Sequence, residues 1–208
     1  MKKFTILYIL LAFLSIGSRI NAQNQQNLIY VGIPRESFDF YSATQEKSEW
    51  CWAASLQMIF NYYGVNITQD QIVERTYGDD RNGNPPDWSG TLDVITENLN
   101  NWNVDNNGRK YVVQATLNYG APTPLYLVQE LKAQHPVLIG YRSGPNSSHA
   151  VVITACSYIE TRNGPYIQTV VVRDPWPSNQ NIINKGRIEY KGIDLANVIE
   201  ASWFISVE

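Results

Sequence analysis

The sequence predicts an α+β protein, in which a helical N-terminal half packs against an antiparallel β-sheet formed by the C-terminal half. Apolar residues recur at three- and four-residue spacing behind residue 51, which is the pattern of an amphipathic helix. From about residue 110 onward, short runs rich in β-branched and aromatic residues alternate with turn residues. One domain is expected, because 208 residues with 44% hydrophobic content are enough for one packed core.

The first 22 residues have the layout of a secretory signal peptide. Two lysines precede an apolar run over residues 4–16, and small and polar residues follow as far as Ala22. The run is too short for a good membrane span, so we expect cleavage after Ala22 and no stable span in the mature protein. The mature domain is then residues 23–208, exported to a periplasm or secreted. An uncleaved anchor helix is the alternative.

The charge pattern excludes some partners. Sixteen basic residues stand against nineteen acidic residues, with no run of either sign. Nucleic-acid binding and an anionic membrane surface both call for a basic patch, so neither is expected.

The stretch QEKSEWCWAASLQMIFNYYG, residues 45–64, is expected to be a short loop followed by a helix that begins at Cys51. Leu56, Ile59 and Phe60 form its apolar face, and Gly64 is placed to end it. The thiol therefore lies in the first turn of a helix, where unpaired backbone N–H groups favour a thiolate.

A thiolate at this position is a candidate nucleophile. Gln45, six residues before Cys51, can supply an amide donor for an oxyanion. Such a site also needs a base and a group that orients the base.

The remainder of the N-terminal half is expected to contain two further helices. Residues 23–41 are read as a polar, extended lead-in. Thr68 and Gln71 form a capping box that begins the next helix, which ends near Gly78. A third helix is expected over residues 91–99, followed by an asparagine-rich break at 98–108.

The loop at residues 79–90, DDRNGNPPDWSG, is rich in turn formers and contains one large apolar residue, Trp88. This tryptophan either lines a substrate cleft or anchors the loop. We take Trp88 and the neighbouring Gly90 as candidate substrate-binding residues.

The C-terminal half is expected to form an antiparallel sheet with one helix. The helix begins at Thr123-Pro124 and runs to about Gln134. Asn163-Gly164 indicates a hairpin. Strands are expected at residues 110–116, 137–141, 148–159, 166–173, 187–190 and 202–207.

Only two histidines are present. His135 precedes a proline at a helix-to-strand junction and is judged to have no carboxylate nearby in sequence, so a structural role is expected. His149 opens an apolar strand and is either a capping or surface histidine or the general base; we take it as the candidate base. Asp174, at the end of the strand that the hairpin folds back, is the candidate orienting group. An Asp-Pro pair is also ordinary turn chemistry, so Asp174 could instead be a turn residue.

The two cysteines could form a disulfide in an oxidising compartment. Side chains alternate along a strand, so Cys156, seven residues after His149, is expected to point to the opposite face. If His149 faces Cys51, then Cys156 does not, and a buried free thiol is expected.

At this point the motifs resemble a known family. Gln45 followed by Cys51-Trp52-Ala53-Ala54-Ser55 is similar to the active-site segment of papain-like cysteine peptidases. His149-Ala150-Val151 and Asp174-Pro175-Trp176 resemble their base and orienting segments. The form of residues 48–64 resembles the bacterial branch that contains avirulence-effector cysteine peptidases and is related to bacteriocin-processing (double-glycine) peptidases.

The resemblance implies a papain-like fold with the active site in the cleft between the helical half and the sheet half. It implies Cys51 as nucleophile, His149 as base and Asp174 as orienting residue. Gln45 and the backbone N–H of Cys51 are then the oxyanion donors. Trp176 resembles the tryptophan that shields the orienting pair from water, and it joins Trp88 and Gly90 as a candidate for substrate binding.

Three departures from the plant and lysosomal members are visible. Glu49-Trp50 replaces their glycine-and-cysteine segment, their extra disulfides are missing, and Asp174 stands where they use asparagine. These departures leave the chemistry implied by the resemblance unchanged, but a papain-type substrate preference does not follow from it.

The expected function is therefore an exported cysteine peptidase that cleaves peptides or proteins through a thioester acyl-enzyme, without a cofactor or metal. Two alternatives remain open: a cysteine hydrolase acting on cell-wall peptides or other amides, and a non-catalytic binding domain on a peptidase scaffold. No residue pattern specifies an inhibitor protein.

Overall fold

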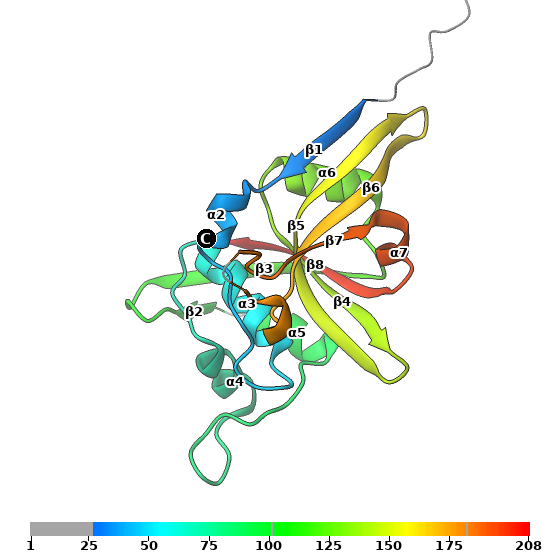
Figure 1. Ribbon diagram of the computed structural model, residues 1–208. Helices are drawn as coiled ribbons and strands as arrows, with labels where there is room; N and C mark the ends of the chain where they lie inside the picture. The colour runs from blue at the N-terminus through cyan, green and yellow to red at the C-terminus, as the bar shows by residue number, and fades with distance from the viewer. Residues whose placement is uncertain (1–26, 101, 182) are drawn as a thin grey trace, which may run out of the picture.

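The computed structural model describes residues 27–208 except 101 and 182; the predicted signal peptide lies outside this part of the chain. Helices cluster around the N-terminal part of the chain, and the C-terminal part forms most of a sheet (Figure 1). The predicted α+β class is therefore confirmed. Among the described residues, no helix is both long and apolar enough to cross a membrane.

Three helices make up the predicted helical half, and their bounds agree with the expected ranges to within about two residues. Thr68 accepts a hydrogen bond from the backbone N–H of Gln71, and the Gln71 side chain accepts one in return from the Thr68 N–H. Gly78 caps the end of the same helix. The helices are α3 (Cys51–Tyr62), α4 (Gln69–Tyr77) and α5 (Leu92–Leu99).

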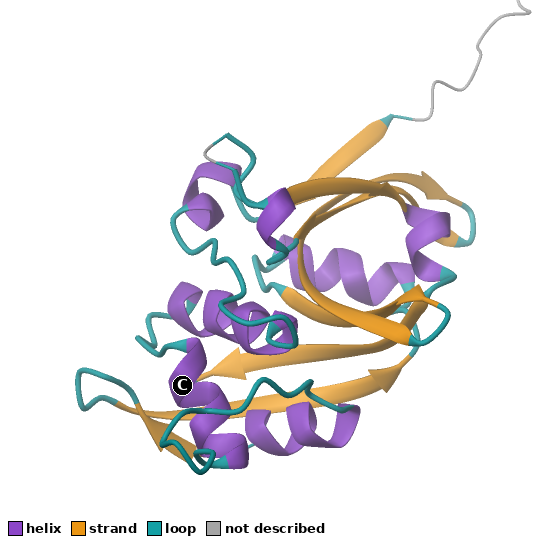
Figure 2. Ribbon diagram, turned by 60° about the horizontal axis from the view of Figure 1, so that its bottom comes forward, coloured by secondary structure: helices purple, strands orange, loops and turns teal. Residues whose placement is uncertain are grey.

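The described strands form one antiparallel sheet in the order β2-β3-β8-β4-β5-β6-β7, and β1 pairs with β5. Figure 2 shows that the sheet is strongly curled. β8, the last strand along the chain, lies between β3 and β4. The strands are β1 (Leu28–Gly32), β2 (Trp102–Val104), β3 (Lys110–Tyr119), β4 (Val137–Gly144), β5 (Ser147–Thr161), β6 (Gly164–Arg173), β7 (Arg187–Lys191) and β8 (Ile199–Val207).

Two apolar clusters hold the fold together. The first joins the helical half to the sheet, with Leu56 and Ile59 of α3 packed in the same cluster as Val152 and Trp203. The second lies on the other side of the sheet, where α6 (Pro124–Lys132) and α7 (Gly192–Ala196) cover it. Full burial of one such aliphatic side chain contributes about 1.5–3 kcal/mol, so the first cluster holds the helical half on the sheet and the second holds α6 and α7 on its other face.

Some local predictions were wrong. The lead-in contains β1, which pairs with β5, and the short helix α2 (Arg35–Asp39). The asparagine-rich break contains β2, and α7 had no predicted counterpart. β1 and β2 are short strands stabilised by pairing with distant partners, and such pairing overrides weak local preference.

Candidate active site

Cys51 is the first residue of α3, as its sequence position predicted. The first helical hydrogen bond runs from the Ala54 N–H to the Trp50 carbonyl at 2.9 Å, so the N–H of Cys51 precedes the helical bonding pattern. The thiol is free and partly buried. A free thiol and a backbone N–H donor therefore lie at the same helix end.

One turn further along α3, the buried Ser55 hydroxyl donates to the carbonyl of Ala150 at 3.1 Å. Ala150 follows His149 on β5. This bond fixes the start of α3 against the strand that carries His149. A buried hydrogen bond thus joins the helical half to the sheet half next to Cys51 and His149, where the two halves were predicted to meet.

The His149 ring is oriented by Asp174, because its Nε2 lies 2.7 Å from Oδ1 of that carboxylate. Burial lowers the pKa of His149, but the interactions of the ring with Asp174 and with the Cys51 thiol outweigh burial and raise that pKa from 6.5 to about 9. With Nε2 bonded to the carboxylate, Nδ1 is the nitrogen left for the thiol.

Asp174 is held as a carboxylate by several donors. Burial raises its pKa, but the bond with His149 and the donors of the following loop lower it more, and the net pKa is below the usual value. The Trp176 N–H donates to Oδ1 at 2.8 Å, and Nδ2 of Asn179 donates to Oδ2 at 2.9 Å. Asp174 is thus a charged hydrogen-bond acceptor in the folded protein, not merely a turn residue.

The Asn179 contact is a feature that sequence reasoning missed. Asn179 lies in a short 3-10 turn (Pro177–Asn179) five residues after Asp174. A polar residue in the loop after a candidate catalytic carboxylate was the only signal available.

Gln45 lies buried in the loop before α3, where its Nε2 donates to the carbonyls of Lys47 and Ser48 at 3.0 and 2.8 Å. Its Oε1 is buried without a hydrogen-bond partner. The backbone N–H of Gln45 donates to the Pro175 carbonyl at 2.9 Å. The residue therefore shapes the loop that delivers Cys51 and joins it to the segment that carries Asp174.

Two aromatic rings stand edge-on to the His149 ring. Trp176 has its ring centroid 6.1 Å away at 82°, and Tyr141 lies 5.9 Å away at 85°. Trp176 is 46% exposed, so one part of it covers the histidine and another part faces solvent. Tyr141, the cross-strand neighbour of His149, was not identified from the sequence.

The loop at residues 79–90 is fastened by the two tryptophans that flank Cys51. The indole N–H of Trp50 donates to the Pro86 carbonyl at 2.9 Å, and that of Trp52 donates to the Trp88 carbonyl at 3.1 Å. The Trp88 ring itself is 57% exposed and packs edge-on against Tyr77. Trp88 therefore anchors the loop through its backbone and leaves its ring accessible.

Gly90 lies against the ring of Trp52, so closely that a Cβ at this position would be 2.6 Å from Cδ2 of the indole. We expect Gly90→Ala to lower the free energy of unfolding by about 1–3 kcal/mol, because the buried indole has no room to move. Urea denaturation measures this. Gly140→Ala is the control, since its Cβ would meet Trp203 at an ordinary 3.7 Å. Equal stability of the two variants would contradict the expected overpacking.

Cys156 is a free, buried thiol, as predicted, and burial raises its pKa to about 12. The reasoning from alternation was wrong, however. A bulge between Ile153 and Ala155 in the pairing with β6 places Cys156 in the same apolar cluster as Val151 and Ile153. Separation excludes a link to the site instead: seven residues along a strand span roughly 20 Å.

His135 pairs with Glu130, its Nδ1 lying 3.1 Å from Oε2. The judgement that no carboxylate is near His135 in the sequence was wrong, because Glu130 lies five residues earlier and the end of α6 brings the two side chains together. The pair lies outside the Cys51–His149 site. Among the described residues, no group of three or more His, Cys, Asp or Glu side chains is placed to hold a metal ion.

Comparison with known proteins supports the resemblance seen in the motifs. A search of the curated proteins gave no match. Residues 23–203 match the Peptidase_C39 like family, a span that includes the whole Cys51–His149–Asp174 arrangement. This match supports a papain-like cysteine peptidase of the C39 kind, in agreement with the α+β fold. The chain therefore belongs to the Peptidase_C39 like family.

Proposed function

We propose that the protein is an exported cysteine peptidase that hydrolyses peptide bonds with a Cys51–His149–Asp174 triad. The observation that carries this proposal is the His149 ring, whose Nε2 lies 2.7 Å from Oδ1 of Asp174 and whose pKa is raised by Asp174 and by the Cys51 thiol. A thiol, an imidazole and a carboxylate in this order are the components of nucleophilic acyl transfer.

In the proposed reaction, the thiolate of Cys51 attacks the carbonyl carbon of the substrate while His149 is an imidazolium. The tetrahedral intermediate collapses by breaking the C–N bond, and the leaving amine takes the proton of His149. A water molecule then gives a proton to His149 and attacks the thioester. Breaking the C–S bond releases the carboxylic acid and restores the thiolate.

The oxyanion is proposed to be held by the Cys51 backbone N–H and the amide of Gln45. Loss of one such donor in related sites costs about 2.7–4 kcal/mol of transition-state stabilisation. The Gln45 amide already donates to two loop carbonyls, so its oxyanion role requires one of these bonds to be shared or released when substrate binds. The backbone N–H of Cys51 precedes the helical hydrogen-bond pattern, so it can bind the oxyanion without giving up a helical bond.

The exposed rings of Trp88 and Trp176 support a peptide or protein substrate. Both stand next to catalytic elements, and half-exposed indoles provide apolar contact area with little loss of side-chain entropy. Export is proposed from the N-terminal layout of residues 1–22 alone.

Cleavage profiling on a mixed peptide library tests the proposal. We expect defined cleavage products from the mature chain, and a covalent adduct at Cys51 with an epoxysuccinyl cysteine-protease inhibitor, located by mass spectrometry. A parallel incubation with muropeptides measures the alternative activity on cell-wall amides. Cleavage of muropeptides alone would reject the proposed substrate class, and failure of both reactions together with no adduct would reject catalysis.

A further inference from the structure

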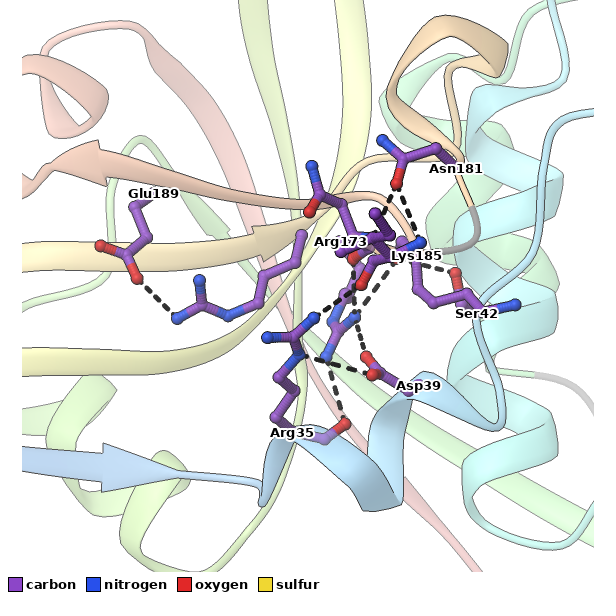
Figure 3. A network of polar contacts seen from close by, with 10 residues as sticks. Arg35, Asp39, Ser42, Arg173, Asn181, Lys185 and Glu189 are labelled. Atoms are coloured by element: carbon purple, nitrogen blue, oxygen red, sulfur yellow. Dashed lines mark hydrogen bonds and ion pairs between the residues drawn. The ribbon is translucent and has the colours of Figure 1, made fainter.

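Arg173 is the residue directly before Asp174, and its side chain is only 1% exposed. The guanidinium forms an ion pair with Asp39 of α2. It also donates to three backbone carbonyls (Figure 3). These belong to Arg35, Asn184 and Lys185. One buried cation thus connects the end of β6, the helix α2 and a turn near residue 185.

That turn closes the segment at residues 174–186, which we call the aspartate loop. The backbone N–H of Asp174 donates to the Gly186 carbonyl at 2.8 Å, and the backbone N–H of Gly186 donates to the Asn179 carbonyl at 3.2 Å. Gly186 has a φ of 71°, and a Cβ there would lie 2.4 Å from the Asp174 carbonyl oxygen. The backbone of Asp174 and that of Gly186, at the two ends of the loop, are therefore in direct contact.

The N-terminal segment touches the aspartate loop at two more points. The Ser42 hydroxyl lies 2.9 Å from Oε1 of Gln180 and 2.8 Å from the Lys185 carbonyl. The Gln180 side chain in turn donates to the carbonyl of Asp174. The backbone bond from Gln45 to Pro175 is the other point. The segment at 35–45 therefore ends at the loop that delivers Cys51 and also braces the loop that carries Asp174.

We propose that Asp39, Arg173 and Ser42 are positioning residues, which hold the aspartate loop on the N-terminal segment so that Asp174 faces His149. This inference rests on the proposed triad. It assigns to the lead-in segment a role in the active site, although the segment contributes no reacting group other than the Gln45 donor.

The chemistry of Arg173 supports positioning over simple packing. A buried ion pair is a poor source of stability compared with apolar residues of similar volume, because both charges lose their hydration. A planar guanidinium with several donors, however, fixes the direction of every acceptor that it contacts. Three of the acceptors of Arg173 are backbone carbonyls, so its guanidinium holds the backbone near residues 35 and 184–185 in a fixed position relative to β6.

The ionisable groups that face His149 are Cys51 from α3, Asp174 from the end of β6 and Tyr141 from β4. Burial and a bond to Tyr190 raise the pKa of Tyr141, which keeps this group neutral. None of the proposed positioning residues is among these groups. Substitution of a positioning residue is therefore expected to change the pKa of His149 by displacing Asp174.

The test is an NMR titration of the histidines in the full mature chain. Only two histidines are present, so ¹³C-histidine labelling gives two imidazole signals, and His135→Gln assigns them. We expect Ser42→Ala and Asp39→Asn to lower the midpoint of His149 by about one pH unit, a tenfold change, because its bond to Asp174 is weakened. Glu189→Gln is the control: it removes one carboxylate that pairs with Arg187, outside the contacts to the aspartate loop (Figure 3).

Ser42→Ala decides the outcome, since it changes no charge and removes only a hydroxyl. A folded Ser42→Ala protein whose His149 midpoint stays within about 0.2 unit of the wild type overturns the proposal. A similar fall in Glu189→Gln also overturns it, because the shift of the His149 midpoint would then not be specific to the contacts with the aspartate loop. The titration needs no substrate, so it reads the positioning role even if peptide cleavage is not found.

Discussion

Cys51→Ala is expected to lower kcat/KM for peptide cleavage by at least about 10⁴-fold, because no other group in the site can form the thioester. The thiol is at the start of α3 and is only partly buried, so its removal leaves the helix contacts of Ser55 and Leu56 in place. Cleavage of a library-derived peptide by the wild type and the variant measures the loss. Circular dichroism and a thermal melt establish that both are folded.

Cys156→Ala is the matched control, because it removes the same atom from a buried site away from the triad. We expect it to keep near wild-type activity, with a modest loss of stability from the small cavity. A Cys51→Ala protein that cleaves at the wild-type rate would remove the basis for the proposed function.

Asp174→Ala is expected to lower kcat by about 10²-fold or more, with a smaller change in KM, because Asp174 orients the base and does not touch the substrate. The imidazolium of His149 persists below its pKa of about 9 and is lost as the pH rises through that value. Without the carboxylate, burial dominates and the pKa of His149 falls. The basic limb of the pH–rate profile should then move to lower pH.

Asp174→Asn separates orientation from charge. The amide oxygen of Asn can still accept a hydrogen bond from Nε2–H of His149, so this variant should keep more activity than Asp174→Ala. The basic limb of its pH–rate profile should still move to lower pH, because the negative charge is lost. The exposed Asp194→Asn on α7 serves as the control for loss of a carboxylate. A rate and a pH profile unchanged in folded Asp174→Ala would reduce the site to the Cys51–His149 pair.

The elements that the sequence predicted well are those defined by local chemistry. The capping box at Thr68, the proline-led start of α6 and the hairpin at Asn163-Gly164 each depend on residues a few positions apart. The candidate triad was accessible for a related reason, since only two cysteines and two histidines were available and Cys51 stood at a helix start. Composition reduced the possibilities before any geometry was known.

The features that escaped prediction depend on contacts between distant residues. β1 is a strand because it pairs with residues 155–159 of β5, and nothing within residues 28–32 states that partner. Asp39 and Arg173 are 134 positions apart, so neither charge indicates the other. The bulge near Thr154 reversed the expected face of Cys156, because one extra residue changes the alternation of everything after it.

The central place of β8 affects when the protein can become active. This strand is the last element of the fold to leave the ribosome, yet both β3 and β4 pair with it, through contacts such as Thr116 with Phe204 and Leu138 with Trp203. Until residues 199–207 are made, the sheet has a gap in its middle, and such non-local pairing forms slowly. The proposed nucleophile, Cys51 on α3, is thus translated before the strand that completes the sheet. A nascent chain is therefore expected to carry no assembled site, which separates synthesis of this hydrolase from its first turnover.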